Sequence, residues 1–353
     1  VAGKLKRLAQ SPATDRLWHA LMDARQKTGN ESLSIDVGKI QEKVDMKYDE
    51  IQADAIRKAA VSKVMVLTGG PGTGKTTTTQ GIIAAYRSFG LKILLAAPTG
   101  RAAKRMTEAT GLEAKTIHRL LECKPPEGYQ KNEDNPLDGD VLIIDECSMI
   151  DMILMNALLK AIPEGMRLIL VGDTDQLPAV GPGSLLQDLI DSRVMPVVQL
   201  TEVFRQAMES HIVSNAHRIV DGQLPELTYK TGDFFFLGRS SGHDVVQTVL
   251  DLCHHRLPDT YGYSVFSGLQ VLCPGRKGEL GTVELNRRLQ ELLNPPEKEK
   301  KELTVEGRML RMGDKVMHTR NNYDIGWTRD DGEIGSGVFN GDIGILEDID
   351  PRE

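Results

Sequence analysis

Short apolar runs alternate with segments of helical spacing in the region that starts near residue 47. Between the runs, apolar residues recur three and four positions apart, which is the spacing of one helix face. Strands that are apolar on both faces and joined by helices are typical of parallel sheets covered on both sides. The pattern therefore predicts an α/β fold with a parallel sheet. The runs that predict its strands are 64–68, 93–97, 141–144 and 168–171.

The segments outside these runs predict other features. Residues 1–46 are polar and helical, and we expect Trp18 on their apolar face to anchor the core rather than bind a ligand. Residues 123–139 are rich in Pro, Gly and Asn, which predicts a small excursion on the surface.

The signals after residue 206 are shorter and further apart. Phe234-Phe235-Phe236 predict a buried strand, and residues 270–274 begin a second α/β pattern with a helix over 282–293. Short apolar runs at 315–318 and 343–346, divided by Gly and Asn turns, predict a small β element.

The composition excludes several classes of protein. Of 353 residues, 40% are hydrophobic and 26% are charged, which excludes a disordered chain and one embedded in a membrane. The formal net charge of −7 excludes bulk positive charge as the means of holding nucleic acid, but not a local basic groove. The sequence has no apolar run of about 18 residues and no signal-peptide pattern, so we expect a cytoplasmic protein with no membrane partner. The four cysteines are widely spaced without a C-x-x-C pair, which favours reduced thiols.

Residues 69–76 match the full phosphate-loop pattern G-x-x-x-x-G-K-[ST], after a predicted strand and before a predicted helix. Glycines let successive N–H groups turn towards phosphates, and the positive end of the following helix points at them. We expect Lys75 to reach the β- and γ-phosphates and the Thr76 hydroxyl to hold Mg²⁺. The sequence therefore predicts a nucleoside-triphosphate site.

Two acids, Asp145 and Glu146, directly follow the apolar run 141–144. We expect Asp145 to bind the Mg²⁺ and Glu146 to act as the general base for an attacking water. The alternative is an acid pair that only caps a helix. A complete phosphate loop in the same chain favours hydrolysis of a nucleoside triphosphate over that alternative.

The roles of two further residues cannot be decided from their spacing alone. Gln176 follows the run 168–171, where its amide would reach the γ-phosphate and the attacking water, although most loop glutamines are only solvated. Arg205 would serve as an arginine finger supplied in cis. Spacing does not decide either assignment.

Taken in order, these motifs resemble those of the superfamily 1 helicases, in particular the RecD-like branch that moves 5′ to 3′. The resemblance covers residues 47–346. Gln52 matches the Q motif that reads adenine, and Gln176 and Arg205 fall in motifs III and IV. The other matches are 69–77 (motif I), 97–103 (motif Ia), 116–121 (a DNA-contact motif), 145–148 (motif II), and 271–286 with 313–342 (the second motor domain and its SH3-like insertion).

The resemblance implies a RecA-like P-loop NTPase sheet, a partial second RecA-like domain and the start of an SH3-like β insertion. The boundaries expected from it are 1–46 for an N-terminal helical segment, 47–208 for the ATP-binding motor domain with a pin-like hairpin at 122–140, 209–306 for the start of the second RecA-like domain, and 307–353 for the incomplete remainder with its insertion.

The resemblance also implies ATP and Mg²⁺ as cofactors. Its catalytic residues would be Lys75, Glu146, Gln176 and Arg205, and its metal ligands Thr76 and Asp145. Its nucleotide-binding residues would be Gln52, Gly70, Pro71, Gly72, Thr73, Gly74, Lys75, Thr76 and Thr77. Its DNA-binding residues would be Pro98, Thr99, Arg101, His118, Arg119 and Asn321.

The segment 101–119 holds five basic and two acidic residues within an otherwise acidic chain. A basic strip beside a strand end follows phosphates without reading bases, as a motor that moves along any sequence requires. The insert after residue 122 corresponds in position to the strand-separating pin of RecD-like enzymes, and Tyr129 is its candidate for stacking on a base.

The chain departs from the family because it ends before motifs V and VI. We therefore expect weak nucleotide binding and little DNA-stimulated hydrolysis from these 353 residues. The expected partners are single-stranded DNA, its junctions with duplex, and subunits of a repair complex, in the bacterial cytosol or nucleoid. Two alternatives stay open: an ATPase switch or loader that does not translocate, and a subunit of a repair nuclease complex without unwinding of its own.

Overall fold

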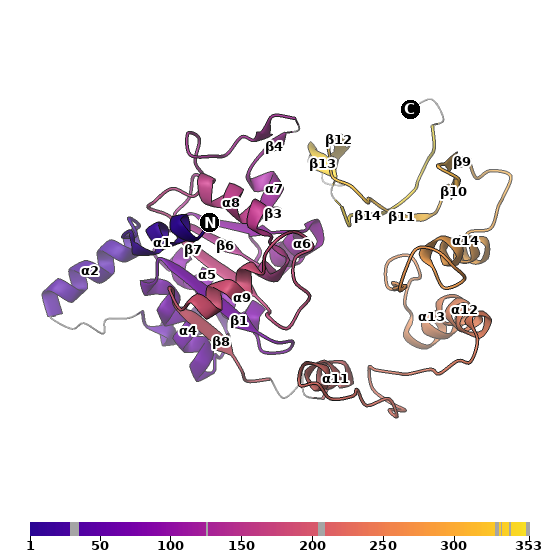
Figure 1. The fold of residues 1–353 in the computed structure, drawn as a ribbon, viewed down its shortest axis with the longest axis horizontal. Helices are drawn as coiled ribbons and strands as arrows, with labels where there is room; N and C mark the ends of the chain where they lie inside the picture. The colour runs from indigo at the N-terminus through magenta and orange to yellow at the C-terminus, as the bar shows by residue number, and fades with distance from the viewer. Residues whose placement is uncertain are drawn as a thin grey trace. The chain divides into compact units, whose positions relative to one another are not determined.

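The computed structural model describes residues 1–28, 35–124, 126–203, 209–328, 332, 334–338 and 340–350 of the chain. The chain divides into two compact units, Val1–Phe235 and Phe236–Glu353. Each unit has its own helices and strands (Figure 1).

A six-stranded sheet forms the centre of the first unit, and its neighbouring strands are parallel (Figure 1). The strand order is β3-β2-β6-β7-β1-β8. In the register, Val64 of β1 lies opposite Leu168 of β7, and Val66 lies opposite Val197 of β8. The strands are β1 (Val64–Gly69), β2 (Ile93–Ala97), β3 (Ala114–Thr116), β6 (Val141–Ile144), β7 (Arg167–Gly172) and β8 (Val197–Leu200). The four strands predicted from apolar runs are confirmed, and so is the RecA-like α/β fold.

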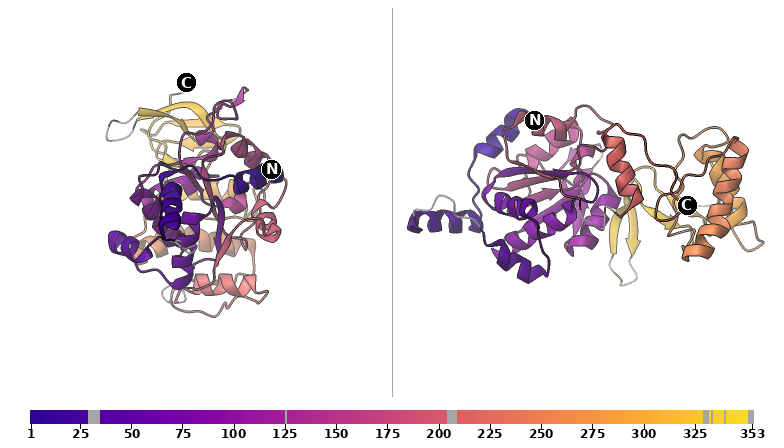
Figure 2. Two further views of the ribbon diagram at one scale, coloured as in Figure 1. Left: turned by 90° about the vertical axis from the view of Figure 1, so that its left-hand side faces the viewer. Right: turned by 90° about the horizontal axis from the view of Figure 1, so that it is seen from below.

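Alternate residues of the strands face opposite sides of the sheet, as the pleat requires. Val64 and Val66 pack into one core cluster, whereas Met65 and Leu67 pack into the other. Helices cover both faces (Figure 2). On the first side lie α1 (Ala2–Gln10), α7 (Ile117–Leu120), α8 (Met152–Ala161) and α9 (Leu185–Ser192). On the second lie α2 (Arg16–Thr28), α3 (Val37–Val44), α4 (Glu50–Val61), α5 (Lys75–Ser88) and α6 (Gly100–Thr110).

Three smaller elements complete the first unit. The 3₁₀ turn η1 (Cys147–Met149) follows β6, and α11 (His211–Val220) lies beyond β8 in the chain. Strands β4 (Cys123–Lys124) and β5 (Gly128–Tyr129) form a short antiparallel hairpin that is separate from the main sheet. The polar excursion predicted after residue 122 is therefore this hairpin and its loop.

The second unit combines helices with paired strands. Asp314 links them, because its carboxylate accepts hydrogen bonds from Gln290 and Asn294 of the helix region at 2.5 and 2.8 Å, and from the backbone N–H of Arg311 at 2.7 Å. The helices are α12 (Gly242–Asp251), the π-helical η2 (Leu252–Arg256), α13 (Leu257–Tyr261) and α14 (Thr282–Leu293). The antiparallel pairs are β9 (Glu302–Val305) with β10 (Arg308–Arg311), β11 (Lys315–Met317) with β14 (Ile343–Ile345), and β12 (Asn322–Thr328) with β13 (Ile334–Val338).

The predicted helix over 282–293 and the strands near 315 and 343 are confirmed, but the strand predicted at Phe234-Phe235-Phe236 is wrong, and no strand begins the α/β pattern expected from 270–274. Phe235 and Phe236 are 49% and 57% exposed, and the segment 270–274 is irregular with Leu272 89% exposed. A strand must pair its backbone N–H and C=O groups, and among the described residues neither segment is hydrogen-bonded into a sheet. An apolar run alone does not supply that partner.

Within the described part of the chain, no helix is both long enough and apolar enough to span a bilayer.

Candidate functional site

Three adjacent strands at the centre of the sheet deliver the predicted catalytic residues to one edge. In the sheet order β6, β7 and β1 are neighbours, and all three are parallel. Asp145 and Glu146 follow β6, Asp173 and Gln176 follow β7, and the phosphate loop follows β1. Because the carboxyl ends of parallel strands meet at one edge, these groups converge where α/β folds bind ligands.

The phosphate loop takes its shape from its glycines. Gly72 and Gly74 have φ angles of 75° and 82°, the left-handed region that glycine enters without strain. A Cβ on Gly69 would lie 2.6 Å from the Thr73 hydroxyl oxygen and 2.8 Å from the Leu200 carbonyl oxygen, so only glycine fits. The Thr73 hydroxyl donates to the Gly70 carbonyl at 2.9 Å, which closes the loop before α5 begins.

Lys75 points its ammonium group back into the loop. The Nζ donates to the carbonyl oxygens of Gly69 and Gly70 at 2.6 and 2.9 Å. It also lies 3.5 Å from the Asp173 Oδ2, and the Asp173 side chain is almost fully buried. The cation is thus held inside the loop that phosphates would enter.

The acid pair after β6 has two different environments. Burial raises the pKa of Asp145, whose Oδ1 accepts the Glu146 N–H at 2.8 Å. Glu146 has a left-handed backbone, with φ 55°, which is uncommon for a residue with a side chain. Its Oε1 accepts a hydrogen bond from the Arg105 Nη2 of α6 at 2.6 Å.

The other two predicted catalytic residues are Gln176 and Arg205. Gln176 is exposed, and its Nε2 lies 3.5 Å from the Asp173 Oδ2. Arg205 lies outside the described residues, as do residues 204 and 206–208 around it.

Gln52 lies in the first turn of α4 and forms a capping box with Asp49. Its Oε1 accepts the Asp49 N–H at 3.2 Å, and its own N–H donates to the Asp49 Oδ1 at 2.8 Å. Its Nε2 is buried and has no hydrogen-bond partner among the described residues. A buried donor without a partner is costly, and an acceptor on a bound nucleobase would satisfy it.

The residues present fit a nucleotide with Mg²⁺. Mg²⁺ in such sites takes one or two protein oxygens, with the rest from phosphates and water. The Asp145 carboxylate and the exposed Thr76 at the start of α5 are ligands of that kind. Within the described residues, no group of three His, Cys, Asp or Glu side chains could hold a metal without a substrate.

All the predicted DNA-contact residues except Asn321 follow the next two strands of the same sheet, β2 and β3. Thr99 caps α6, because its side chain accepts the Ala102 N–H at 3.2 Å. Thr116 caps α7 in the same way through the Arg119 N–H at 3.2 Å. Arg101 and Arg119 are exposed, each in the first turn that its cap fixes. Pro98 lies directly before the first of these caps.

His118 and Asn321 lie in more constrained surroundings. The His118 ring is half-buried, 6.0 Å from the Tyr129 ring, and burial lowers its pKa, so it is neutral at pH 7. Tyr129 itself packs partly buried against the core, which limits how far it can stack on a base. In the second unit, the Asn321 side chain accepts the Asn340 N–H at 2.8 Å and so orders a turn.

Three contacts at the site involve residues that the sequence analysis did not single out. They are the Asp173 pair with Lys75, the Arg105 pair with Glu146, and the His217 Nε2 of α11, which lies 3.2 Å from the Pro71 carbonyl oxygen. The sequence held a signal for two of these residues, since Asp173 follows a predicted strand and Arg105 lies in the basic segment 101–119. Nothing in the sequence around His217 indicated a contact with the phosphate loop.

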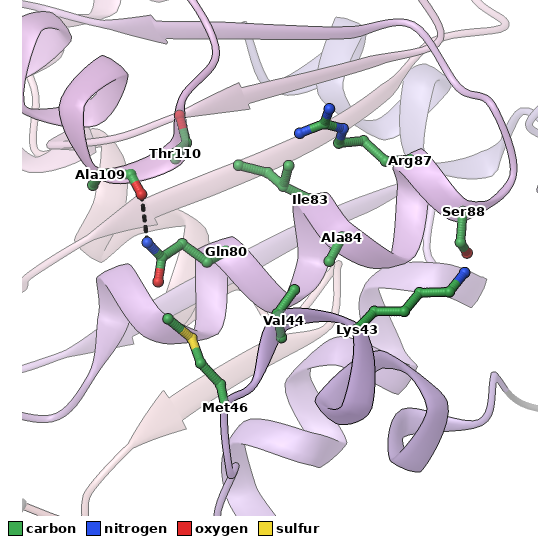
Figure 3. A pocket seen from close by; sticks show the side chains of 10 residues that line it. All are labelled: Lys43, Val44, Met46, Gln80, Ile83, Ala84, Arg87, Ser88, Ala109 and Thr110. Carbon is green, nitrogen blue, oxygen red and sulfur yellow. Dashed lines mark hydrogen bonds between the residues drawn. The ribbon is translucent and has the colours of Figure 1, made fainter.

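A hollow of about 460 Å³ lies among α3, α5 and α6, away from the phosphate loop (Figure 3). It is lined by the second half of α5, and in it the Gln80 Nε2 donates to the Ala109 carbonyl at 2.5 Å. No residue of the phosphate loop lines it. It is therefore separate from the candidate ATP site.

Comparison with known proteins identifies the family. The family described as "AAA domain" matches residues 52–182, and the "ATP-dependent RecD-like DNA helicase SH3 domain" matches residues 285–353. The ATP-dependent RecD2 DNA helicase of Deinococcus radiodurans is 39% identical over 298 residues, which cover 84% of this chain and 38% of that protein. The chain is a RecD-like member of helicase superfamily 1.

The RecD-like chain is also similar to RecD subunits of RecBCD enzymes. The RecBCD enzyme subunit RecD of Mycobacterium tuberculosis is 31% identical over 340 residues, which cover 85% of the chain and 55% of the subunit. The RecD-like chain thus spans about two fifths to just over half of these two relatives. The crystal structure of Pif1 helicase from Candida albicans matches 87% of the chain and 70% of that structure at 18% identity, with a TM-score of 0.47, and adds nothing to the assignment.

Proposed function

We propose that the RecD-like chain is the ATP-hydrolysing part of a DNA helicase that moves 5′ to 3′ on single-stranded DNA. The observation that carries the proposal is the row of strand ends along one sheet edge. Groups suited to ATP hydrolysis follow β6, β7 and β1, and exposed cations follow the neighbouring β2 and β3. Hydrolysis and DNA contact would then share one rigid sheet, which is what a motor requires.

On the nucleotide side, the Gln52 Nε2 would donate to the adenine. The backbone N–H groups of Gly70 and of Gly72–Thr77, on either side of Pro71, would surround the phosphates. Lys75 would exchange the Gly69 and Gly70 carbonyls for phosphate oxygens. Thr76 and Asp145 would hold Mg²⁺, which neutralises phosphate charge when bound.

Three residues would act on the water and the γ-phosphate. Glu146 would take the proton from the attacking water, and Gln176 would orient that water. Arg205 would stabilise the negative charge that develops on the transferred group. The Glu146 Oε1 accepts from Arg105, so this oxygen is engaged while the ion pair is in place.

On the DNA side, Arg101 and Arg119 would follow phosphates by charge, with Pro98 and Thr99 setting their helix. His118 and Asn321 would add neutral hydrogen bonds. These contacts do not recognise particular bases. The expected substrates are single-stranded DNA and its junctions with duplex. A relative named as a RecBCD subunit supports partners in a repair complex, in the bacterial cytosol.

The test uses a natural chain that extends past Glu353, with duplexes that carry either a 5′ or a 3′ tail. We expect unwinding from the 5′ tail only. Lys75→Ala should abolish ATP hydrolysis, and Glu146→Gln should trap ATP-bound protein on DNA. Unwinding from the 3′ tail would overturn the direction, and normal turnover by Glu146→Gln would overturn the assignment of the base.

The second candidate is an ATPase switch or loader. It keeps the same phosphate loop and acid pair but has no use for exposed cations beyond β2 and β3. Hydrolysis by the longer chain that oligonucleotides do not stimulate would favour it over the helicase.

A further inference from the structure

One ion pair joins the two halves of the proposed site. Arg105 lies on α6, the helix that begins at the Thr99 cap and carries three of the five basic residues of the segment 101–119. Its Nη2 donates to the Glu146 Oε1 at 2.6 Å, across 41 residues of sequence. The proposed base of hydrolysis is thus held by a cation from the DNA-contact side.

The two partners differ in their access to solvent. The Glu146 side chain is 18% exposed, whereas the Arg105 side chain is 62% exposed. A phosphate arriving at α6 can therefore reach the guanidinium while the carboxylate stays in the site. The left-handed backbone of Glu146 fixes where its side chain starts, so the more exposed Arg105 is the partner free to move.

The pair also occupies one of the two carboxylate oxygens of Glu146. A carboxylate oxygen that accepts a charge-assisted hydrogen bond is engaged and less basic. While Arg105 donates to it, the Glu146 Oε1 is not available to a water.

A phosphate is a strong competitor for this cation. The planar guanidinium pairs with phosphate, as it does with carboxylate, through two parallel N–H···O hydrogen bonds. An ion pair with one partner this exposed shifts an equilibrium only a few-fold. The neighbours Arg101 and Lys104 are exposed too, so a DNA backbone at this helix meets three cations at once.

We infer that Arg105 is a positioning residue that couples DNA binding to ATP hydrolysis. Without DNA it holds Glu146 away from the attacking water, and a DNA phosphate takes it over and releases the base. The inference rests on the proposed function, since it requires Glu146 as the base and α6 as a DNA contact.

The first test measures binding of a labelled oligo-dT by fluorescence anisotropy at low salt, with the 353-residue chain itself. If DNA and Glu146 compete for Arg105, Glu146→Gln should tighten binding about threefold, the size expected for a partly exposed pair. In an Arg105→Gln background the same change should have no effect. Glu108→Gln is the matched control, because Glu108 is an exposed acid of α6 with no ion pair among the described contacts.

The control separates a specific pair from general repulsion of DNA. We expect Glu108→Gln to act equally in both backgrounds. If Glu146→Gln also tightens binding equally in both backgrounds, Arg105 does not mediate the effect and the inference is overturned.

The second test measures ATP hydrolysis by a chain extended past Glu353, with and without oligo-dT. Arg105→Gln should raise the DNA-free rate several-fold and lower the ratio of stimulated to DNA-free rates. An unchanged DNA-free rate would overturn the inference but leave the helicase proposal in place. The result that would overturn the helicase proposal is a different one: hydrolysis that Lys75→Ala does not abolish.

Discussion

At the scale of single residues, a buried ion pair ties the N-terminal segment to the sheet. Arg167 of β7 is fully buried, and its Nε lies 2.5 Å from the Asp15 Oδ2. The guanidinium also donates to the Ser62 carbonyl at 2.7 Å and lies 6.0 Å from the ring centroids of Trp18 and Tyr86. The cation therefore has partners on several sides, and the half-buried Trp18 lies beside this ion pair.

Asp15→Ala would leave the Arg167 charge buried without its counter-ion. We expect it to lower the free energy of unfolding by about 3–5 kcal/mol, the usual loss when one partner of a buried pair is removed. The control is Lys58→Gln, which breaks the exposed pair with Asp54 at 2.8 Å and should cost less than about 1 kcal/mol. Urea denaturation of both variants measures the difference, and equal losses would contradict a structural role for the buried pair.

Lys63 makes stability depend on pH. Burial, reinforced by the Arg167 charge, lowers its pKa from 10.5 to about 8 in the folded chain. Between these two pH values Lys63 is protonated in the unfolded state but not in the folded state. Its contribution to the free energy of unfolding therefore increases as the pH rises. Below pH 8 the cost of the buried charge is present in full.

The measurement compares the chain with Lys63→Met in urea, once near neutral pH and once between pH 8 and 10.5. We expect the stability of the original chain, relative to Lys63→Met, to be greater at the higher pH. A relative stability that falls or stays constant would mean that Lys63 keeps its ordinary pKa when folded.

At the scale of elements, the hairpin of β4 and β5 remains a candidate for a strand-separating pin. Its backbone is tied at the base, since the N–H groups of Gln130 and Lys131 donate to the carbonyls of Glu122 and Leu121 at 3.3 and 3.1 Å. Tyr129 packs against the core, so the loop beyond it is the part available to DNA.

Deletion of residues 128–135 tests the pin in a chain extended past Glu353. We expect unwinding of 5′-tailed duplex to fall at least about tenfold while hydrolysis stimulated by single-stranded DNA is kept, because separation would be lost but not translocation. Tyr129→Ala is the companion variant and tests whether packing alone explains a loss. Unwinding that survives the deletion would remove the pin from the mechanism.

Elements were predictable where the local pattern and the tertiary partners agree. The phosphate loop, β1 and α5 follow from a motif whose glycines, lysine and helix start are contiguous in sequence. The helix α14 was predicted with its observed bounds, since helical hydrogen bonds are local. The strands expected at 234–236 and 270–274 are absent from the described sheets, because a strand depends on a neighbour that its own sequence does not supply.

At the scale of the whole molecule, the chain covers 38% of its RecD2 relative from Deinococcus radiodurans. The resemblance to RecD-like helicases implies that a second motor domain closes over ATP and completes the catalytic site. We therefore expect the 353-residue chain to bind ATP weakly and to show little DNA-stimulated hydrolysis.

Calorimetric titration with ATP and steady-state hydrolysis with and without oligo-dT check this expectation. A longer chain that includes a second motor domain should gain at least about tenfold in DNA-stimulated rate, if that domain completes the site. Robust unwinding by the purified 353-residue chain would contradict the expectation.

The candidate ATP site of this protein could be predicted from its sequence because it consists of short contiguous motifs. A glycine loop with Lys75 and Thr76, and an acid pair after an apolar strand, need no distant residue to be recognised. The contacts between motifs could not be read in this way. The strand order brings Lys75 to Asp173, 98 positions away, and places Arg105 beside Glu146. Pairing of parallel strands across long crossovers sets that order, and only the packed sheet brings the DNA side and the ATP side together.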